Sequence, residues 1–209
     1  MNSIIPGATH YRSSYLGADF SRLSSYREQL RCLQVPPPAS VLVIGKGDGL
    51  VVSTISDMGY LVDTLDISSE LDPTHVGDVR SLPFDDNSYD VVMCCQVLEH
   101  IPFVEVSEAV AEISRVARKQ TIISVPDQRR YMGLEASLFR FKMNLQFSLP
   151  RLLPKTIPEA RFSEMGHYWE VGYKGFPAKK VIKTITNGGK KRVFRVHNMP
   201  WHLFITQWV

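Results

Sequence analysis

The chain has 209 residues, of which 44% are apolar and 22% are charged. This length suits one α/β domain with a substantial core, and the composition excludes wholesale disorder. Lysine and arginine number 24 against 21 acidic residues, and the net charge of +3 is too small to indicate nucleic acid or an anionic membrane by itself.

Membrane-spanning and disulfide-rich classes are not expected either. The longest unbroken apolar run, 91–95, has five residues and is too short to cross a bilayer. The first residues lack the basic and apolar regions of a secretory signal. Cys32, Cys94 and Cys95 are odd in number and lack C-x-x-C spacing, which fits neither a disulfide framework nor a zinc site. We therefore expect a cytoplasmic domain with no membrane span and with Cys94 and Cys95 in its core.

The first sixty residues predict a helix, a strand and a second helix. Four apolar side chains recur at helical spacing between residues 17 and 34, and the three prolines at 36–38 prevent the helix from continuing. The run 41–44 is apolar at every position, which is typical of a strand buried on both faces. A helical pattern over 50–58 ends at Gly59.

Strands and helices alternate from residue 60 to residue 125. Strands are expected over 60–67, 75–76, 89–95 and 121–125, and a helix over 103–119. Strands that alternate with helices form mainly parallel sheets covered on both faces, so the fold class is α/β.

The last third has a different pattern. Leu134, Leu138, Phe141 and Leu145 are spaced as one face of a helix, which indicates core packing or, alternatively, a lid over a pocket. A helix over 177–186 precedes two strands, 192–197 and 202–208, that are expected to form an antiparallel hairpin. We expect one domain, 1–209, made of a helical cap (1–40), a core (41–125), a lid or acceptor region (126–176) and a C-terminal helix and hairpin (177–209).

A glycine-rich turn follows the strand at 41–44. Gly45, Gly47 and Gly49 let a ligand approach the backbone closely, but their spacing is not that of the dinucleotide fingerprint, and no Walker A pattern is present. Asp66 ends the second strand, 21 residues after Gly45, where a carboxylate can accept hydrogen bonds from both ribose hydroxyls of a nucleoside. Asp78 comes 12 residues later.

Two nearby segments are more specific than the glycine turn. Residues 82–90 read Leu-Pro-Phe-Asp-Asp-Asn-Ser-Tyr-Asp, and residues 97–101 read Val-Leu-Glu-His-Ile. With them, the core 41–125 resembles the class I S-adenosylmethionine (SAM)-dependent methyltransferases, most closely the small bacterial and archaeal type related to the quinone-biosynthesis methyltransferases. The resemblance implies SAM as cofactor and a Rossmann-like fold, with a seven-stranded, mostly parallel sheet and a C-terminal antiparallel hairpin. The stripe at 134–145 would be a helical lid insertion.

The resemblance also assigns the cofactor site. The three glycines would border the methionine part of SAM, Asp66 would bind the ribose, and Asp78 with the Val79 backbone would recognise the adenine. An adenine amino group needs an acceptor and the ring nitrogens need a donor, which agrees with this assignment. The expected site also includes Lys46, Ile67 and Gln96. The alternative is that Asp66 and Asp78 only form turns at strand ends.

Two positions depart from the family pattern. Val43 stands where an acid commonly helps to hold the cofactor ammonium, so about 1–3 kcal/mol of charge-assisted hydrogen bonding is missing or comes from another group. Gln96 stands where some relatives have a glutamate that binds magnesium with a Glu-His pair three residues later. Glu99 and His100 form that pair here, but a neutral Gln96 weakens a site for a hard cation, so no metal is expected.

Methyl transfer from a sulfonium requires mainly in-line alignment, and positioning can supply ~7–11 kcal/mol. If the acceptor must lose a proton, His100 and His167 are the candidate bases. His100 follows the fourth strand, and His167 lies beside aromatic and acidic residues in Gly-His-Tyr-Trp-Glu at 166–170. The competing interpretations are a locally bonded histidine for His100 and a packed surface loop for His167.

The region after the core indicates a small acceptor. Only 126–177 remains to build specificity, and its apolar residues, with Tyr168 and Trp169, suffice to roof a pocket. The basic clusters lack aromatic interleaving, so no nucleic acid is expected as a partner. We predict a SAM-dependent methyltransferase for a small molecule. The alternatives are a non-catalytic or weakly active module that binds SAM or a partner and, less favoured, an NAD(P)-dependent oxidoreductase or an RNA methyltransferase.

Overall fold

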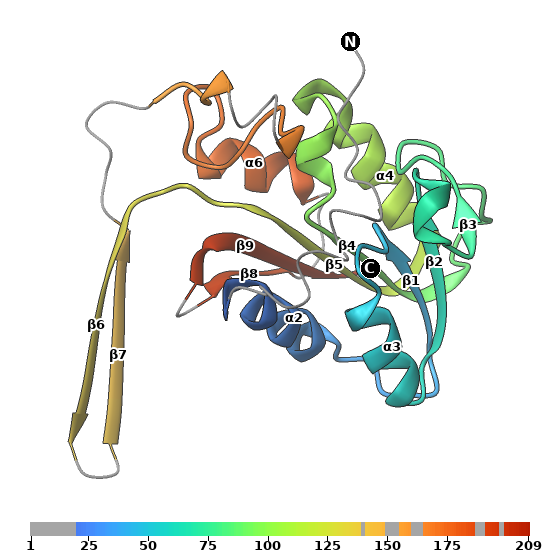
Figure 1. The fold of residues 1–209 in the computed structure, drawn as a ribbon, viewed down its shortest axis with the longest axis horizontal. Coiled ribbons are helices and arrows are strands. Elements are labelled where there is room, and N and C mark those ends of the chain that lie inside the picture. Colours follow the sequence, from blue (N-terminus) through green and yellow to red (C-terminus); the bar gives the residue numbers. More distant parts are fainter. Residues whose placement is uncertain (1–19, 139–140, 149–154, 160–164, 187–190, 197–198) are drawn as a thin grey trace.

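The structure is a computed structural model that describes residues 20–138, 141–148, 155–159, 165–186, 191–196 and 199–209. Its centre is a seven-stranded sheet in the order β3-β2-β1-β4-β5-β9-β8 (Figure 1). The first five strands in this order are mutually parallel, and β9 runs antiparallel to both of its neighbours. The strands are β1 (Ser40–Ile44), β2 (Leu61–Asp66), β3 (His75–Val76), β4 (Tyr89–Cys95), β5 (Ala117–Pro126), β8 (Lys191–Val196) and β9 (Met199–Trp208). The expected fold class, including the C-terminal antiparallel hairpin, is confirmed.

Helices cover both faces of the sheet, α2 and α3 on one face and α4 and α6 on the other (Figure 1). The strand β1 shows how the sequence dictates this arrangement, because successive side chains of a strand point to opposite faces. Val41 and Val43 pack in the core under α2 and α3, whereas Leu42 and Ile44 pack in the core under α4 and α6. The helices are α2 (Phe20–Cys32), α3 (Leu50–Asp57), α4 (Val106–Val116) and α6 (Ala178–Ile185), with short 3₁₀ turns η1 (Ser69–Leu71), η2 (Leu98–His100) and η3 (Phe103–Glu105).

The boundary between α4 and β5 differs from the expectation. The helix ends at Val116 rather than at residue 119, and β5 begins at Ala117. Ala117 pairs with Tyr89 of β4, and from Gln120 onward β5 pairs with β4 on one side and β9 on the other. Residues 117–119 therefore belong to β5, which pairs with neighbouring strands, although their local pattern also fits the end of a helix.

The helix expected over 134–145 is wrong. This segment forms two strands, β6 (Tyr131–Leu138) and β7 (Phe141–Ser148), that pair antiparallel with each other in a separate two-stranded sheet. The four residues of the supposed helical stripe are cross-strand partners, Leu134 with Leu145 and Leu138 with Phe141. The lid is therefore not helical, and the hairpin projects away from the main sheet (Figure 1).

Other expectations hold within the described residues. Cys94 is fully buried, Cys95 packs partly buried against the core under α2 and α3, and all three cysteines are unpaired. None of the helices in the described part of the chain is long and apolar enough to cross a membrane. Residues 1–19 of the expected cap lie outside the described residues.

Candidate functional site

The glycine turn lies at the carboxyl end of β1, where parallel α/β sheets bind their ligands. Gly45, Gly47 and Gly49 all have positive φ, at 80°, 58° and 78°. A Cβ at Gly45 would lie 2.4 Å from the Val97 Cγ2 atom, so both the backbone angle and the close approach of the loop after β4 require glycine there. This turn is anchored to β2, because the Gly45 N–H donates to the Leu65 carbonyl at 2.8 Å.

Asp66 ends β2 directly beside this turn. One carboxylate oxygen accepts the Lys46 backbone N–H at 2.9 Å, and the other accepts the Ser68 N–H at 3.0 Å. The side chain is buried, and each carboxylate oxygen keeps a second lone pair for a ligand. The Asp66 carboxylate thus holds the glycine turn in place at the position from which the sequence predicts ribose binding. Ile67, the next residue, is 51% exposed.

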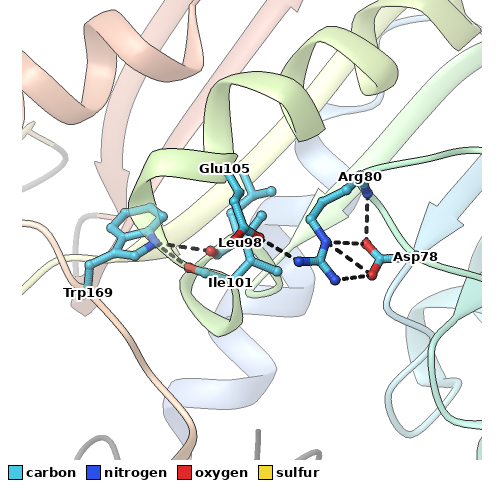
Figure 2. Close-up of polar contacts among 6 residues, drawn as sticks. All are labelled: Asp78, Arg80, Leu98, Ile101, Glu105 and Trp169. Atoms are coloured by element: carbon cyan, nitrogen blue, oxygen red, sulfur yellow. Dashed lines mark hydrogen bonds and ion pairs between the residues drawn. The ribbon is translucent and has the colours of Figure 1, made fainter. Parts of the chain in front are cut away.

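Asp78 lies beyond β3 and is held by Arg80 (Figure 2). The Arg80 backbone N–H and the guanidinium Nε both donate to Asp78 Oδ1 at 2.9 Å, and a guanidinium nitrogen also pairs with Oδ2. These hydrogen bonds to Arg80 lower the pKa of Asp78. The same guanidinium pairs with Glu105 of η3, so Arg80 joins the loop after β3 to the start of α4. The neighbouring Val79 is buried.

The loop after β4 faces the glycine turn. Gln96 has a positive φ of 58°, its backbone N–H donates to the Ser124 carbonyl at 2.9 Å, and its amide donates to the Ser124 hydroxyl at 3.1 Å. Gln96 is therefore tied to β5, and the adjacent Val97 meets Gly45. Val43, at the position where the methyltransferases that the sequence resembles commonly have an acid, is buried within β1 between Thr64 and Met93.

Residues 165–173 form a segment, here called the strap, that runs along η2 at the carboxyl end of β4. The Tyr168 N–H donates to the Glu99 carbonyl at 2.8 Å. The Trp169 Nε1–H donates to the Leu98 and Ile101 carbonyls, both at 3.1 Å (Figure 2). Trp169 is fully buried in the core, so it fastens the strap to η2 rather than roofing an open pocket.

The strap brings the two candidate bases together. The rings of His100 and His167 meet edge to face with their centroids 4.9 Å apart. Glu99 joins them, since ligand-type atoms of Glu99, His100 and His167 all lie within 4.8 Å of one another. His167 Nδ1 is hydrogen-bonded to Glu170 Oε1 at 2.7 Å, and Glu99, His167 and Glu170 are all buried.

Burial sets the protonation of this cluster. It raises the pKa of Glu99 to about 7, against a partial opposing effect of His167. It lowers the pKa of His100 to about 4, helped by the nearby His167 and partly offset by a hydrogen bond between the His100 ring and the Gly166 backbone. His100 is therefore neutral at pH 7, and its Nδ1 atom has no hydrogen-bond partner among the described residues.

The sequence indicated His100 and His167 separately but not that they touch. Their separation along the chain is 67 residues, and no local pattern connects them. The one available signal was the His-x-x-Glu spacing of His167 and Glu170, which permits a carboxylate to orient the imidazole. The role of Trp169 in placing this strap was also missed, because an aromatic residue in an irregular segment gives no indication of its partner.

Comparison with known proteins agrees with this architecture. Residues 42–125 match the family model described as "Methyltransferase domain". The matched range includes β1, the glycine turn, Asp66, Asp78 and the Glu99-His100 pair. No curated protein matches the chain.

Three solved structures share the fold over most of the chain. The PH0226 protein from Pyrococcus horikoshii is 16% identical, with a TM-score of 0.61 over 97% of this chain and 99% of its own. A SAM-dependent methyltransferase from Aquifex aeolicus is 14% identical, with a TM-score of 0.60 over 95% and 98%. One from Mesorhizobium loti is 13% identical, with a TM-score of 0.59 over 89% and 98%. The chain thus has a methyltransferase-domain sequence at 42–125, and its fold is that of SAM-dependent methyltransferases.

Proposed function

We propose that this protein is an enzyme that transfers the methyl group of SAM to a small-molecule acceptor. The observation that carries the proposal is the joint placement of Asp66 and the glycine turn, in which the Lys46 N–H donates to Asp66. The methyltransferase-domain match covers the same residues. The relation to quinone-biosynthesis methyltransferases and the cytoplasmic location stay predictions from the sequence.

The cofactor would lie across the carboxyl ends of β1, β2, β3 and β4. Gly45, Gly47 and Gly49 would border its methionine part, and the free lone pairs of Asp66 would accept the ribose hydroxyls. Asp78, oriented by Arg80, would accept the adenine amino group beside the Val79 backbone. Lys46, Ile67 and Gln96 lie on the same loops and would complete the site.

The acceptor would approach from the side of the strap. Bound SAM would supply an electrophilic methyl group: an acceptor hydroxyl would form the new bond to the methyl carbon as the carbon–sulfur bond breaks, and the bonding pair would stay on the sulfur of S-adenosylhomocysteine. The acceptor proton would pass to a base, for which the neutral imidazole of His100, with His167 as its neighbour, is the candidate. Positioning supplies most of the acceleration, because the sulfonium methyl is already a strong electrophile.

Calorimetry with SAM, S-adenosylhomocysteine and NAD tests the cofactor assignment. Wild-type protein should bind the first two and not NAD. Asp66→Ala should weaken S-adenosylhomocysteine binding at least tenfold, because the ribose loses its acceptor and the turn loses its anchor. Asp57→Ala, at the exposed end of α3, serves as the matched control and should bind like wild type. Binding of NAD alone would instead favour an oxidoreductase.

A non-catalytic SAM-binding module is the second candidate, because Val43 and Gln96 replace two acids expected in the family. Incubation of SAM with a pool of small metabolites separates the two functions by release of S-adenosylhomocysteine. Turnover that falls in His100→Ala supports the enzyme and the base. Cofactor binding without product, across acceptors of diverse chemistry, supports the module.

A further inference from the structure

Glu99 is a fully buried carboxyl group whose side chain has no hydrogen-bond partner in the part of the chain that the structure describes. Neither of its carboxylate oxygens is bonded within the described residues, and none of its surface is exposed. An isolated buried carboxylate is costly unless it is neutralised or coordinates a cation. The functional site described above gives no role to this side chain.

The two neighbouring histidines each offer a ring nitrogen to the same cluster as Glu99, and one of them is also bonded to a carboxylate. His167 Nδ1 is bonded to the Glu170 carboxylate, which leaves Nε2 as its ligand atom. His100 Nδ1 has no hydrogen-bond partner within the described residues, so it is available as a ligand atom. A second bond from the far nitrogen of the ring is the usual support of a metal-bound histidine.

From this geometry we propose that Glu99, His100 and His167 bind a divalent metal ion of the zinc class, with Glu170 orienting His167. The three potential ligand atoms already lie within 4.8 Å of one another. Ligand atoms around a tetrahedral ion with bonds of 2.0–2.1 Å are about 3.3 Å apart, so metal binding would draw the side chains together by up to about 1.5 Å.

The donor set favours zinc over magnesium. Two imidazoles and one carboxylate are typical of zinc sites, whereas magnesium prefers oxygen ligands and keeps several waters. This site shares Glu99 and His100 with the one considered in the sequence, but its third ligand is His167 instead of an acid at position 96. Gln96 is bonded to Ser124 and is not part of the cluster.

Three protein ligands leave a fourth position for a small ligand, as in catalytic rather than structural zinc sites. If an acceptor hydroxyl takes this position, the ion lowers the pKa of that hydroxyl, and His100 is then a ligand instead of the base. The metal site itself does not depend on the proposed function, because it is built from residues outside the expected cofactor contacts.

Zinc binding by untagged full-length protein tests the proposal. Titration against a chromophoric chelator should give one zinc per chain, and cobalt substitution should give visible absorption bands. Glu99→Gln and His167→Ala should each lower zinc affinity at least 100-fold and abolish the cobalt bands. Glu170→Gln, which removes only the orienting carboxylate, should lower affinity about 10–100-fold. His75→Gln, in the edge strand β3, is the control and should bind zinc like wild type.

Each variant is first tested for cooperative urea unfolding, so that loss of zinc is not confused with loss of folding. No zinc binding by the wild type would overturn the metal site, as would equal affinity in wild type, Glu99→Gln and His167→Ala. Calorimetry with S-adenosylhomocysteine on the same samples separates the two proposals. Cofactor binding without zinc refutes the metal site alone, and zinc binding without cofactor refutes the proposed function alone.

Discussion

Two independent features of the structure restrict position 45 to glycine. Its φ of 80° disfavours any side chain, and the Val97 methyl occupies the space where a Cβ would lie. The second restriction arises from the approach of the loop after β4, which also carries Gln96 and leads into η2. The glycine therefore sets the distance between the glycine turn and the Glu99 cluster, and not only the shape of the turn.

Gly45→Ala should destabilise the protein by at least about 2 kcal/mol more than Gly175→Ala, measured by urea denaturation. Gly175 has a similar φ of 91°, but a Cβ there would meet no atom within 4 Å, so this control isolates the backbone cost of about 1 kcal/mol. Equal losses of unfolding free energy in the two variants would show that the Val97 side chain moves away from the new Cβ without cost.

The parallel strands β1, β4 and β5 are also joined to one another at their amino ends, which lie opposite the candidate site. Asp90 of β4 accepts hydrogen bonds from the Ser40 backbone and hydroxyl of β1 and forms ion pairs with Arg118 and Lys119 of β5. One carboxylate thus joins three neighbouring strands at their amino ends. The lysine hydrogen bond is the largest cause of the lowered pKa of Asp90.

Asp90→Asn should cost about 1 kcal/mol of unfolding free energy at pH 7, because Asn keeps an acceptor for Ser40 but loses the ion pairs. A carboxyl with a lowered pKa stabilises the fold above the pKa of the unfolded chain, 3.8, and loses this effect as the pH falls through the folded value. The difference between variant and wild type should therefore shrink below about pH 4. If the difference in unfolding free energy between variant and wild type did not depend on pH, it would arise from packing and not from the ion pairs.

The hairpin β6–β7 is paired only within itself. Every residue of β6 pairs with β7, and neither strand joins the seven-stranded sheet. Between the apolar pairs lie polar ones, such as Glu135 with Asn144 and Ser137 with Lys142. The apolar residues thus recur with period two in each strand, although four of them also fit a helical spacing.

Replacement of residues 131–148 by a short Gly-Ser linker should leave S-adenosylhomocysteine affinity within about twofold of wild type, because the cofactor loops belong to the main sheet. The urea midpoint should also change little. Loss of cofactor binding would contradict this independence. A change confined to acceptor turnover would place the hairpin in acceptor recognition.

Across the whole molecule, the strap connects the last third of the chain to the core. Trp169 donates to the Leu98 carbonyl of η2 and to the Ile101 carbonyl directly after it, and the Asp127–Val171 bridge extends the contact to the end of β5. His167 and Glu170 lie on either side of Trp169, so the tryptophan fixes the position of the histidine cluster.

Trp169→Phe should lower the unfolding free energy by about 2–3 kcal/mol, because the indole hydrogen bonds are lost in a dry environment. Trp208→Phe, at a position 42% exposed at the end of β9, should change stability by less than about 0.5 kcal/mol. If zinc binds as proposed, Trp169→Phe should weaken it without removing a ligand. Equal stability of the two variants would show that Trp169 contributes only packing.

Sequence patterns alone predicted the α/β class, the order of the core elements and the glycine turn beside Asp66, because these depend on local periodicity and on glycines and acids at strand ends. The run 41–44 predicted a central strand for this reason, and Asp66 was found from its place at the end of the next strand. The local pattern did not predict the secondary structure correctly in two places. In the hairpin, a helical and a strand period fit the same residues, and at residues 117–119 the expected end of a helix is the start of β5.

Packing between distant segments is what brings Glu99, His100 and His167 together and buries Glu99 without a hydrogen-bond partner among the described residues. Contacts between residues 67 positions apart depend on how the strap packs against η2, and that packing depends on the indole of Trp169. Burial likewise decided the electrostatics, since the same carboxyl and imidazole groups would titrate normally in water. The environment of these side chains is a property of the packed core and cannot be derived from their spacing along the chain.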